Sequence, residues 1–152
     1  MTGKLKLMAT DPEDLAVVSA ALQDAIVRVG DMTYLPKRRR FAAVLNRFAW
    51  EEAAGGAGGK GRLYRRVRSG IHFDGVLDVK CHNIAQDKKD AVLCLLAVEF
   101  EGRDGGAGEV SLMFAGGGIV RLDVECIDAA LDDLGPSWTT RNLPRHEVSD
   151  AE

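Results

Sequence analysis

Several short motifs in this chain contain the residue types that bind nucleotides, hold metals or transfer protons. Residues 56–61 have the Gly-x-Gly-x-x-Gly spacing of a dinucleotide-binding turn. In such a site the turn follows a strand and opens a helix, whose N-terminus meets the pyrophosphate. Here residues 62–67 follow, and their composition is that of a strand. We interpret the glycine-rich segment as a hairpin loop and predict no cofactor.

The cysteines and histidines do not have the spacing of a metal site. Cys81 and His82 are adjacent, and neighbouring residues of a strand point to opposite faces of a sheet. Cys81 is predicted to join Leu77 and Val79 in the core, where a thiol is inert. No two cysteines or histidines have the separation typical of zinc ligands. We therefore predict no metal and no reactive thiol.

Acid–base and nucleophilic catalysis have equally little support. Glu99 and Glu101 lie on one side of a predicted strand, whereas the paired acids of glycoside chemistry usually come from different elements across a cleft. We interpret them as a solvated strand edge. No serine has the surroundings of a nucleophile elbow. We lean towards a protein that is not an enzyme and keep as an alternative a small-molecule enzyme whose site forms from distant residues.

Positive charge is concentrated between residues 37 and 68. This window holds ten of the twenty lysines and arginines but two of the 23 acids, so its net charge is +8 and that of the remainder is −11. Such a distribution attracts an acidic partner or the acidic parts of a second copy. The candidate binding residues of this basic face are Lys37, Arg38, Arg39, Arg40, Arg47, Tyr64, Arg66 and Arg68.

Two kinds of partner fit a basic face. If the strands carrying its two clusters pair, arginine and aromatic residues form one stripe, as in single-stranded nucleic-acid binders. However, the pI of about 5.6 is low for a dedicated nucleic-acid binder, and exposed arginines also pair with acids across protein interfaces. We therefore predict a non-catalytic binding or protein-interaction module that binds a protein partner or itself. The alternative is weak, non-sequence-specific binding of single-stranded nucleic acid.

Length and composition indicate one globular domain. The chain has 152 residues, of which 46% are hydrophobic and 28% charged, and a domain of this size buries roughly 68–70% of its unfolded surface. The longest apolar run, residues 91–98, is far shorter than the roughly 20 residues of a membrane-spanning helix. We see no signal peptide, and three widely spaced cysteines favour reduced thiols. We predict a cytoplasmic protein with no membrane contact, one domain over residues 1–135 and a polar tail over 136–152.

Periodicity predicts two helices that flank a run of strands. The first is expected from about Pro12 to Asp24, after a capping box of Thr10 and Glu13. The second is expected over 123–134, where apolar residues recur at helical spacing before Gly135 and Pro136. Strands are expected at about 41–50, 63–73, 77–81, 92–100, 110–114 and 119–124.

These elements predict an α+β fold with a curved, mostly antiparallel sheet. We expect a barrel-like or rolled sheet with one helix near each end, and this is also the element order of pleckstrin-homology-like barrels. The strand at 92–100 is apolar on both faces, so we place it inside the sheet. The predicted core residues are Leu15, Leu22, Val44, Leu45, Val67, Ile71, Val79, Leu93, Leu95, Val98, Leu112, Phe114, Ile127 and Leu131.

Several segments of the chain have a distinctive sequence. Residues 5–15 read Leu-Lys-Leu-Met-Ala-Thr-Asp-Pro-Glu-Asp-Leu, residues 22–25 read Leu-Gln-Asp-Ala, and residues 40–48 contain Arg-Phe and then Val-Leu-Asn-Arg-Phe. They resemble a family of small proteobacterial proteins catalogued only as a domain of unknown function, and looser similarity continues to residue 135. The resemblance implies a bacterial cytoplasmic protein with one compact domain, and a basic window that is a regular part of its design. It implies no activity, cofactor or catalytic residue.

Overall fold

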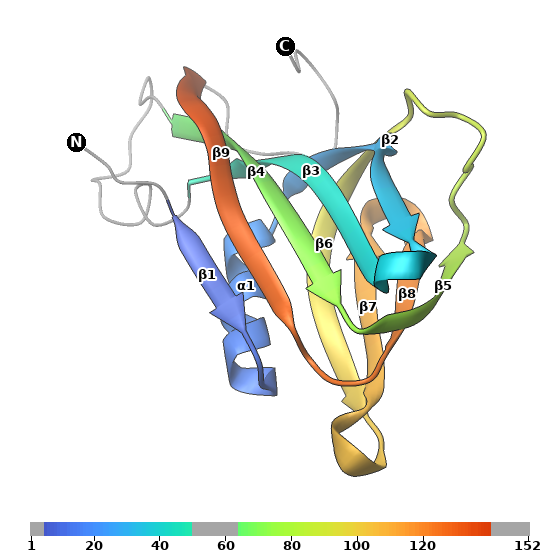
Figure 1. Ribbon diagram of the computed structural model, residues 1–152. Coiled ribbons are helices and arrows are strands. Elements are labelled where there is room, and N and C mark those ends of the chain that lie inside the picture. The colour runs from blue at the N-terminus through green and yellow to red at the C-terminus, as the bar shows by residue number, and fades with distance from the viewer. Residues whose placement is uncertain (1–4, 50–63, 141–152) are drawn as a thin grey trace.

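The computed structural model describes residues 5–49 and 64–140 (Figure 1). The glycine-rich segment at 56–61 and the tail beyond residue 140 lie outside this range. The described chain contains one α-helix and nine strands. They are β1 (Lys6–Ala9), α1 (Pro12–Leu22), β2 (Ala25–Leu35), β3 (Arg40–Phe48), β4 (Tyr64–Asp74), β5 (Val76–His82), β6 (Val92–Gly102), β7 (Gly108–Phe114), β8 (Ile119–Val124) and β9 (Ala129–Thr140).

The nine strands form one antiparallel sheet in the order β1-β9-β4-β3-β2-β6-β7-β8-β5. The predictions of an α+β fold and of a mostly antiparallel sheet are confirmed. β6 pairs on both sides, as its two apolar faces predicted. The edge strands β1 and β5 do not pair with each other, so the sheet is not closed into a barrel.

One glycine forces the sheet to curl. β4 is third from one edge and β5 is the opposite edge, yet Gly75 alone separates them in the chain. The far edge must therefore return to the end of β4, and Figure 1 shows β5 continuing from β4 across the molecule. Gly75 has φ +72°, which glycine adopts without a steric penalty. The amide of Val76 then donates to the carbonyl of Arg39 at 2.8 Å.

Helix α1 confirms the first predicted helix and packs against β6 and β1. Its stripe of Leu15, Val18 and Leu22 is buried in the core. The predicted capping box is wrong by one residue, because Asp11 is the N-cap and its carboxylate accepts from the amide of Asp14 at 2.7 Å. Within the described residues, no helix has the length and apolarity that crossing a membrane requires.

The second predicted helix, at residues 123–134, is wrong, because this segment ends β8 and begins β9. In β9 the side chains of Ala129, Leu131 and Asp133 are buried at alternate positions, while Leu134 is half exposed. Asp133 occupies an inward position and interrupts the alternation of apolar and polar residues that is typical of a strand. The apolar residues of the segment therefore matched the spacing of a helix in the sequence. The analogy with pleckstrin-homology-like barrels depended on that helix. β9 also pairs with β4 as far as Thr140, beyond the domain boundary expected at residue 135.

Most of the predicted core is confirmed, and the exceptions have clear causes. Val44, Val79 and Leu93 are half-buried, and the other predicted core residues are buried. Cys81 and Leu77 are exposed because β5 is an edge strand that buries its first residue, Val76. The predicted elements also omitted β2, in which buried positions alternate from Ala25 to Val29 before the pattern stops.

Candidate functional site

The basic window divides into two clusters at opposite ends of one strand pair. β3 and β4 do pair, but they are antiparallel, with Arg40 opposite Asp74 and Arg68 opposite Asn46. Arg40 and Asn46 are six positions apart in β3, which is about 20 Å at 3.3–3.4 Å per residue. One continuous stripe of arginines is therefore not formed.

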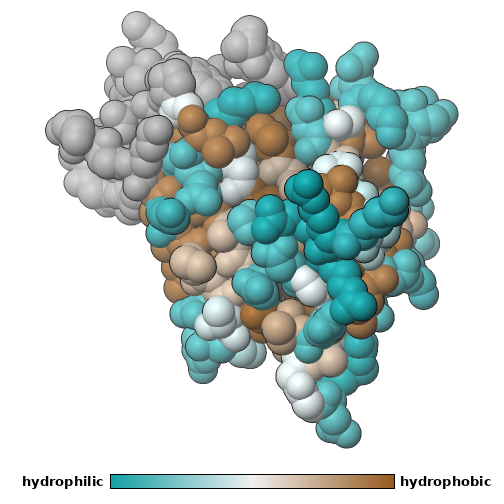
Figure 2. All heavy atoms as spheres, viewed as in Figure 1, coloured by the Kyte–Doolittle hydropathy of each residue, from teal (hydrophilic) through white to brown (hydrophobic). Residues whose placement is uncertain are grey.

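The first cluster is a basic turn, which we define as residues 37–40. It overlaps the short 3₁₀ helix η1 (Pro36–Arg38), which joins β2 to β3. Figure 2 shows hydrophilic side chains gathered over this turn, in the middle of the face in view. Lys37 and Arg38 are exposed, and neither has an ion pair with a described residue.

Ion pairs of the next two residues hold the basic turn in place. Arg39 has φ 51°, and its guanidinium lies 2.6 Å from the carboxylate of Glu125. Arg40 donates to both carboxylate oxygens of Asp74, at 2.7 and 3.3 Å. This bond raises the pKa of Arg40 above its ordinary value. The turn is thus tied to β4 and to the β8–β9 connection.

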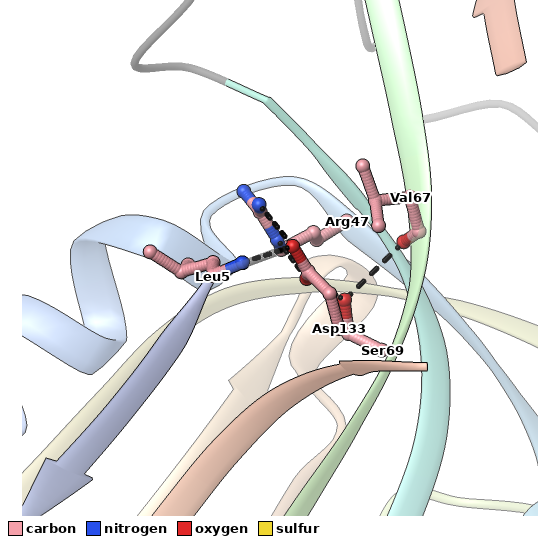
Figure 3. A network of polar contacts seen from close by, with 5 residues as sticks. All are labelled: Leu5, Arg47, Val67, Ser69 and Asp133. Atoms are coloured by element: carbon pink, nitrogen blue, oxygen red, sulfur yellow. Dashed lines mark hydrogen bonds and ion pairs between the residues drawn. The ribbon is translucent and has the colours of Figure 1, made fainter. Parts of the chain in front are cut away.

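Arg47 does not lie on a surface, although it belongs to the predicted basic face. Its side chain is 2% exposed and points into the molecule, where its Nε and Nη2 bond both oxygens of Asp133 at 2.8 and 3.0 Å. Figure 3 shows Ser69 and the backbone of Leu5 reaching the same carboxylate, at 2.7 Å each. This network joins β3, β4, β9 and the residue that precedes β1.

The network keeps Asp133 ionised. Burial alone would raise the pKa of Asp133, but the hydrogen bonds from Arg47, Leu5 and Ser69 outweigh it, so the pKa lies below its ordinary value. A buried arginine–aspartate pair with both charges satisfied is a structural element, and removing one partner is costly. We therefore remove Arg47 from the candidate binding residues.

The lowered pKa of Asp133 predicts an acid-sensitive contribution to stability. The unfolded carboxyl titrates near 3.9 and the folded one lower. The ionised group therefore stabilises the fold above the unfolded value, and this contribution is lost as the pH falls through the folded value. The difference in free energy of unfolding between the wild type and Asp133→Asn should shrink as the pH falls below about 4. Urea titrations from pH 7 downwards measure it, and a constant difference would contradict the prediction.

The remaining candidates lie near the start of β4. Arg66 is half-buried with its guanidinium 5.9 Å from the centre of the Phe48 ring, which is a cation–π distance. Tyr64 begins the strand, where its backbone pairs with Thr140. Arg68 is exposed and faces a cavity.

That cavity has a volume of about 320 Å³ and lies on the outer face of the sheet. β2, β3, β4 and β6 all contribute to its wall. The lining residues are Ile26, Arg28, Asp31, Val44, Leu45, Asn46, Arg68 and Val92. It combines two arginines, one acid and one amide with four aliphatic residues, so its wall is more polar than that of a typical small-molecule site.

Comparison with known proteins identifies a family. The family model described as "Protein of unknown function (DUF2948)" matches residues 5–146. The chain belongs to this family. This confirms the resemblance to a domain of unknown function. No curated protein and no solved structure matches the chain significantly.

Two thiols of this family member, those of Cys81 and Cys94, are poorer nucleophiles than an exposed cysteine, because their pKa is raised. Burial, with the nearby carboxylate of Asp24, raises the pKa of Cys94 to about 11. Partial burial of the thiol group also raises the pKa of Cys81, although the residue as a whole is exposed. A raised pKa keeps a thiol protonated at neutral pH and so lowers its nucleophilicity. In the two described ranges, no three His, Cys, Asp or Glu side chains are grouped as metal ligands.

Sequence reasoning missed the cavity residues Arg28, Asp31 and Asn46, and the buried role of Asp133. The sequence did indicate that Arg47 is buried. In a strand, alternate residues share one face, and Arg47 is an even number of residues from Phe41 and Leu45, which face the core. No comparable signal marked the cavity, because it depends on how β2 pairs with its neighbours.

Proposed function

We propose that the protein is a non-catalytic binding module whose partner docks on the basic turn. One observation carries this proposal. Lys37 and Arg38 are exposed without ion pairs to the described residues, on a turn that the ion pairs of Arg39 and Arg40 hold fixed. Cations presented on a rigid turn recognise an acidic surface with little loss of conformational entropy.

Apolar side chains flank the cations. Leu35 is 38% exposed and directly precedes η1, while Leu77 is 46% exposed. Leu77 follows Val76, whose amide bonds the carbonyl of Arg39, so it lies beside the turn. Protein interfaces combine an apolar centre with a polar rim, and these residues supply both.

The chain offers a complementary surface of its own. Glu99, Glu101 and Asp104 are exposed at the β6–β7 hairpin and have no ion pairs with described residues. Figure 1 shows this hairpin projecting from the bottom of the molecule. We take the acidic hairpin of a second copy as the partner of the basic turn. This contact is heterologous, since two different surfaces meet.

Reversing the charge of the basic turn should weaken salt-sensitive self-association. Exposed ion pairs contribute about 0.2–1 kcal/mol each, so Lys37→Glu with Arg38→Glu should weaken association about tenfold at low salt. Sedimentation equilibrium at two salt concentrations measures this, because screening weakens the wild-type contact as salt rises. Lys80→Glu with Lys88→Glu is the control, since it changes the net charge equally at exposed residues outside the turn.

A mixing experiment distinguishes docking from a general charge effect. The charge-reversed turn variant should associate with a Glu99→Lys, Glu101→Lys variant, because their surfaces are again complementary. A strict monomer at high concentration and low salt would overturn the self-association. Fluorescence anisotropy with a labelled single-stranded oligonucleotide tests the alternative partner. Binding lost in the turn variant but kept in the lysine control would favour nucleic acid.

A further inference from the structure

We propose that the cavity on the outer face of the sheet binds a small organic carboxylate. It lies beside a large bulge in β2. Between Val27 and Met32, β2 advances five residues while its partner β3 advances two, from Leu45 to Ala43. The extra residues turn away from β3, and Figure 1 shows β2 changing direction near the start of β6. Bulges of this kind open a sheet locally and are frequent next to binding sites.

The bulge is held open by backbone bonds to another segment. The amide of Val29 donates to the carbonyl of Ala91, and that of Gly30 to the carbonyl of Lys89, both at 2.9 Å. A Cβ at Gly30 would lie 3.1 Å from both the Cβ and the carbonyl oxygen of Lys89, which is closer than side chains normally pack. The opening between β2 and β3 is therefore built into the backbone and does not depend on a ligand.

The polar groups of the cavity favour a monoanion. Arg28 and Arg68 line it, and neither has an ion pair with a described residue, although Asp31 lines the same cavity. Two guanidinium groups and one carboxylate leave a net charge of +1. A carboxylate neutralises that charge, whereas a phosphate dianion would exceed it and lie near Asp31. Arginine binds a carboxylate with two parallel hydrogen bonds.

A third polar group lacks a partner. The Oδ1 atom of Asn46 is shielded from solvent and has no hydrogen-bond partner among the described residues. Asn46 stands opposite Arg68 in the β3–β4 register and lines the cavity. The same side-chain amide also carries an NH₂ group, and this group can donate to a carboxylate beside Arg68. Buried polar atoms without partners are uncommon and indicate a missing ligand or water.

The rest of the wall is aliphatic. Ile26, Val44 and Val92 come from three different strands and line the cavity. A volume of about 320 Å³ is at the lower end of the range of small-molecule sites. The apolar part of the wall is small and the rest is polar, so the ligand class is a short carboxylate with a small apolar body. The basic turn is not involved, so this site is independent of the proposed docking surface.

Hexanoate is a suitable probe because it combines one carboxylate with an aliphatic chain. Amide chemical shifts of the full chain, followed by NMR during titration, should move saturably at cavity residues. Arg28→Gln and Arg68→Gln should each weaken binding at least about tenfold, since hydrogen bonds to charged groups are strong. Val44→Phe should block the cavity sterically. Arg121→Gln is the matched control, because it removes an exposed arginine from β8.

Two further probes separate the parts of the proposal. Hexanol has the same chain without the charge, and inorganic phosphate has charge without the chain; both should bind at least about tenfold more weakly than hexanoate. Equal binding of hexanol would overturn carboxylate recognition, and preferential binding of phosphate would overturn the choice of ligand class. Hexanoate shifts that persist when both arginines are replaced would place the binding elsewhere. Absence of saturable shifts in the folded wild type would overturn the proposal altogether.

Discussion

Replacing Asp133 with alanine is expected to lower the free energy of unfolding by about 3–5 kcal/mol. The substitution leaves the guanidinium of Arg47, which is 2% exposed, without its ion pair in the core. It also removes the acceptor of the Leu5 amide and of the Ser69 hydroxyl. Chemical denaturation followed by circular dichroism measures the loss.

Two variants show whether the loss comes from the stranded charge. Asp132→Ala is the matched control, because Asp132 is the adjacent residue of β9 and its contact with Lys6 is long, at 4.0 Å, and solvent-exposed. It should change stability by less than about 1 kcal/mol. Arg47→Met combined with Asp133→Leu removes both charges and should recover much of the loss. Equal effects of Asp132→Ala and Asp133→Ala would contradict the role given to the network.

Substitution of Gly108 by alanine is expected to destabilise the protein by about 1–3 kcal/mol. A Cβ at Gly108 would lie 2.5 Å from the carbonyl oxygen of Glu101 and 2.6 Å from the Phe100 ring. Gly108 pairs with Gly102 between β6 and β7, so relief requires the hairpin backbone to move.

Gly135→Ala is the control for this steric argument. A Cβ at Gly135 would meet no atom within 4 Å, so this variant should change stability by less than about 0.5 kcal/mol. Thermal unfolding of both variants tests the difference. If Gly108→Ala unfolds at the wild-type temperature, β6 and β7 do not approach each other as closely as the structure shows.

The local pattern predicted those strands whose inward positions are apolar. In β4 the alternation of Val67, Ile71 and Phe73 was sufficient. In β9 it was not, because Asp133 occupies an inward position and its counter-ion, Arg47, is far away in the sequence. A hydrophobicity pattern treats Arg47 and Asp133 as surface residues. With Asp133 assigned to the surface, the apolar residues of this segment fitted a helix, which is why a helix was predicted in place of β9.

The candidate sites depended on strand pairing, which the sequence specifies less directly. The separation of Arg40 from Arg68 follows from antiparallel pairing, because each basic cluster lies near the start of its own strand. The separation of the two arginines could therefore be predicted from the sequence once β3 and β4 were assumed to pair. The cavity could not be predicted, since it needs a bulge in β2 whose extra residues bond to the segment before β6.

The buried network also bears on how the chain folds during synthesis. Arg47 leaves the ribosome 86 residues before Asp133, and at 5–20 residues per second that interval is roughly 4–17 s. Until Asp133 emerges, burying Arg47 would take its charge out of water without the carboxylate that it bonds in the folded protein. β3 therefore cannot reach its native environment on a nascent chain that lacks β9. The fold should therefore form cooperatively and only after β9 has emerged, and a truncated chain that ends before β9 should stay open to proteases.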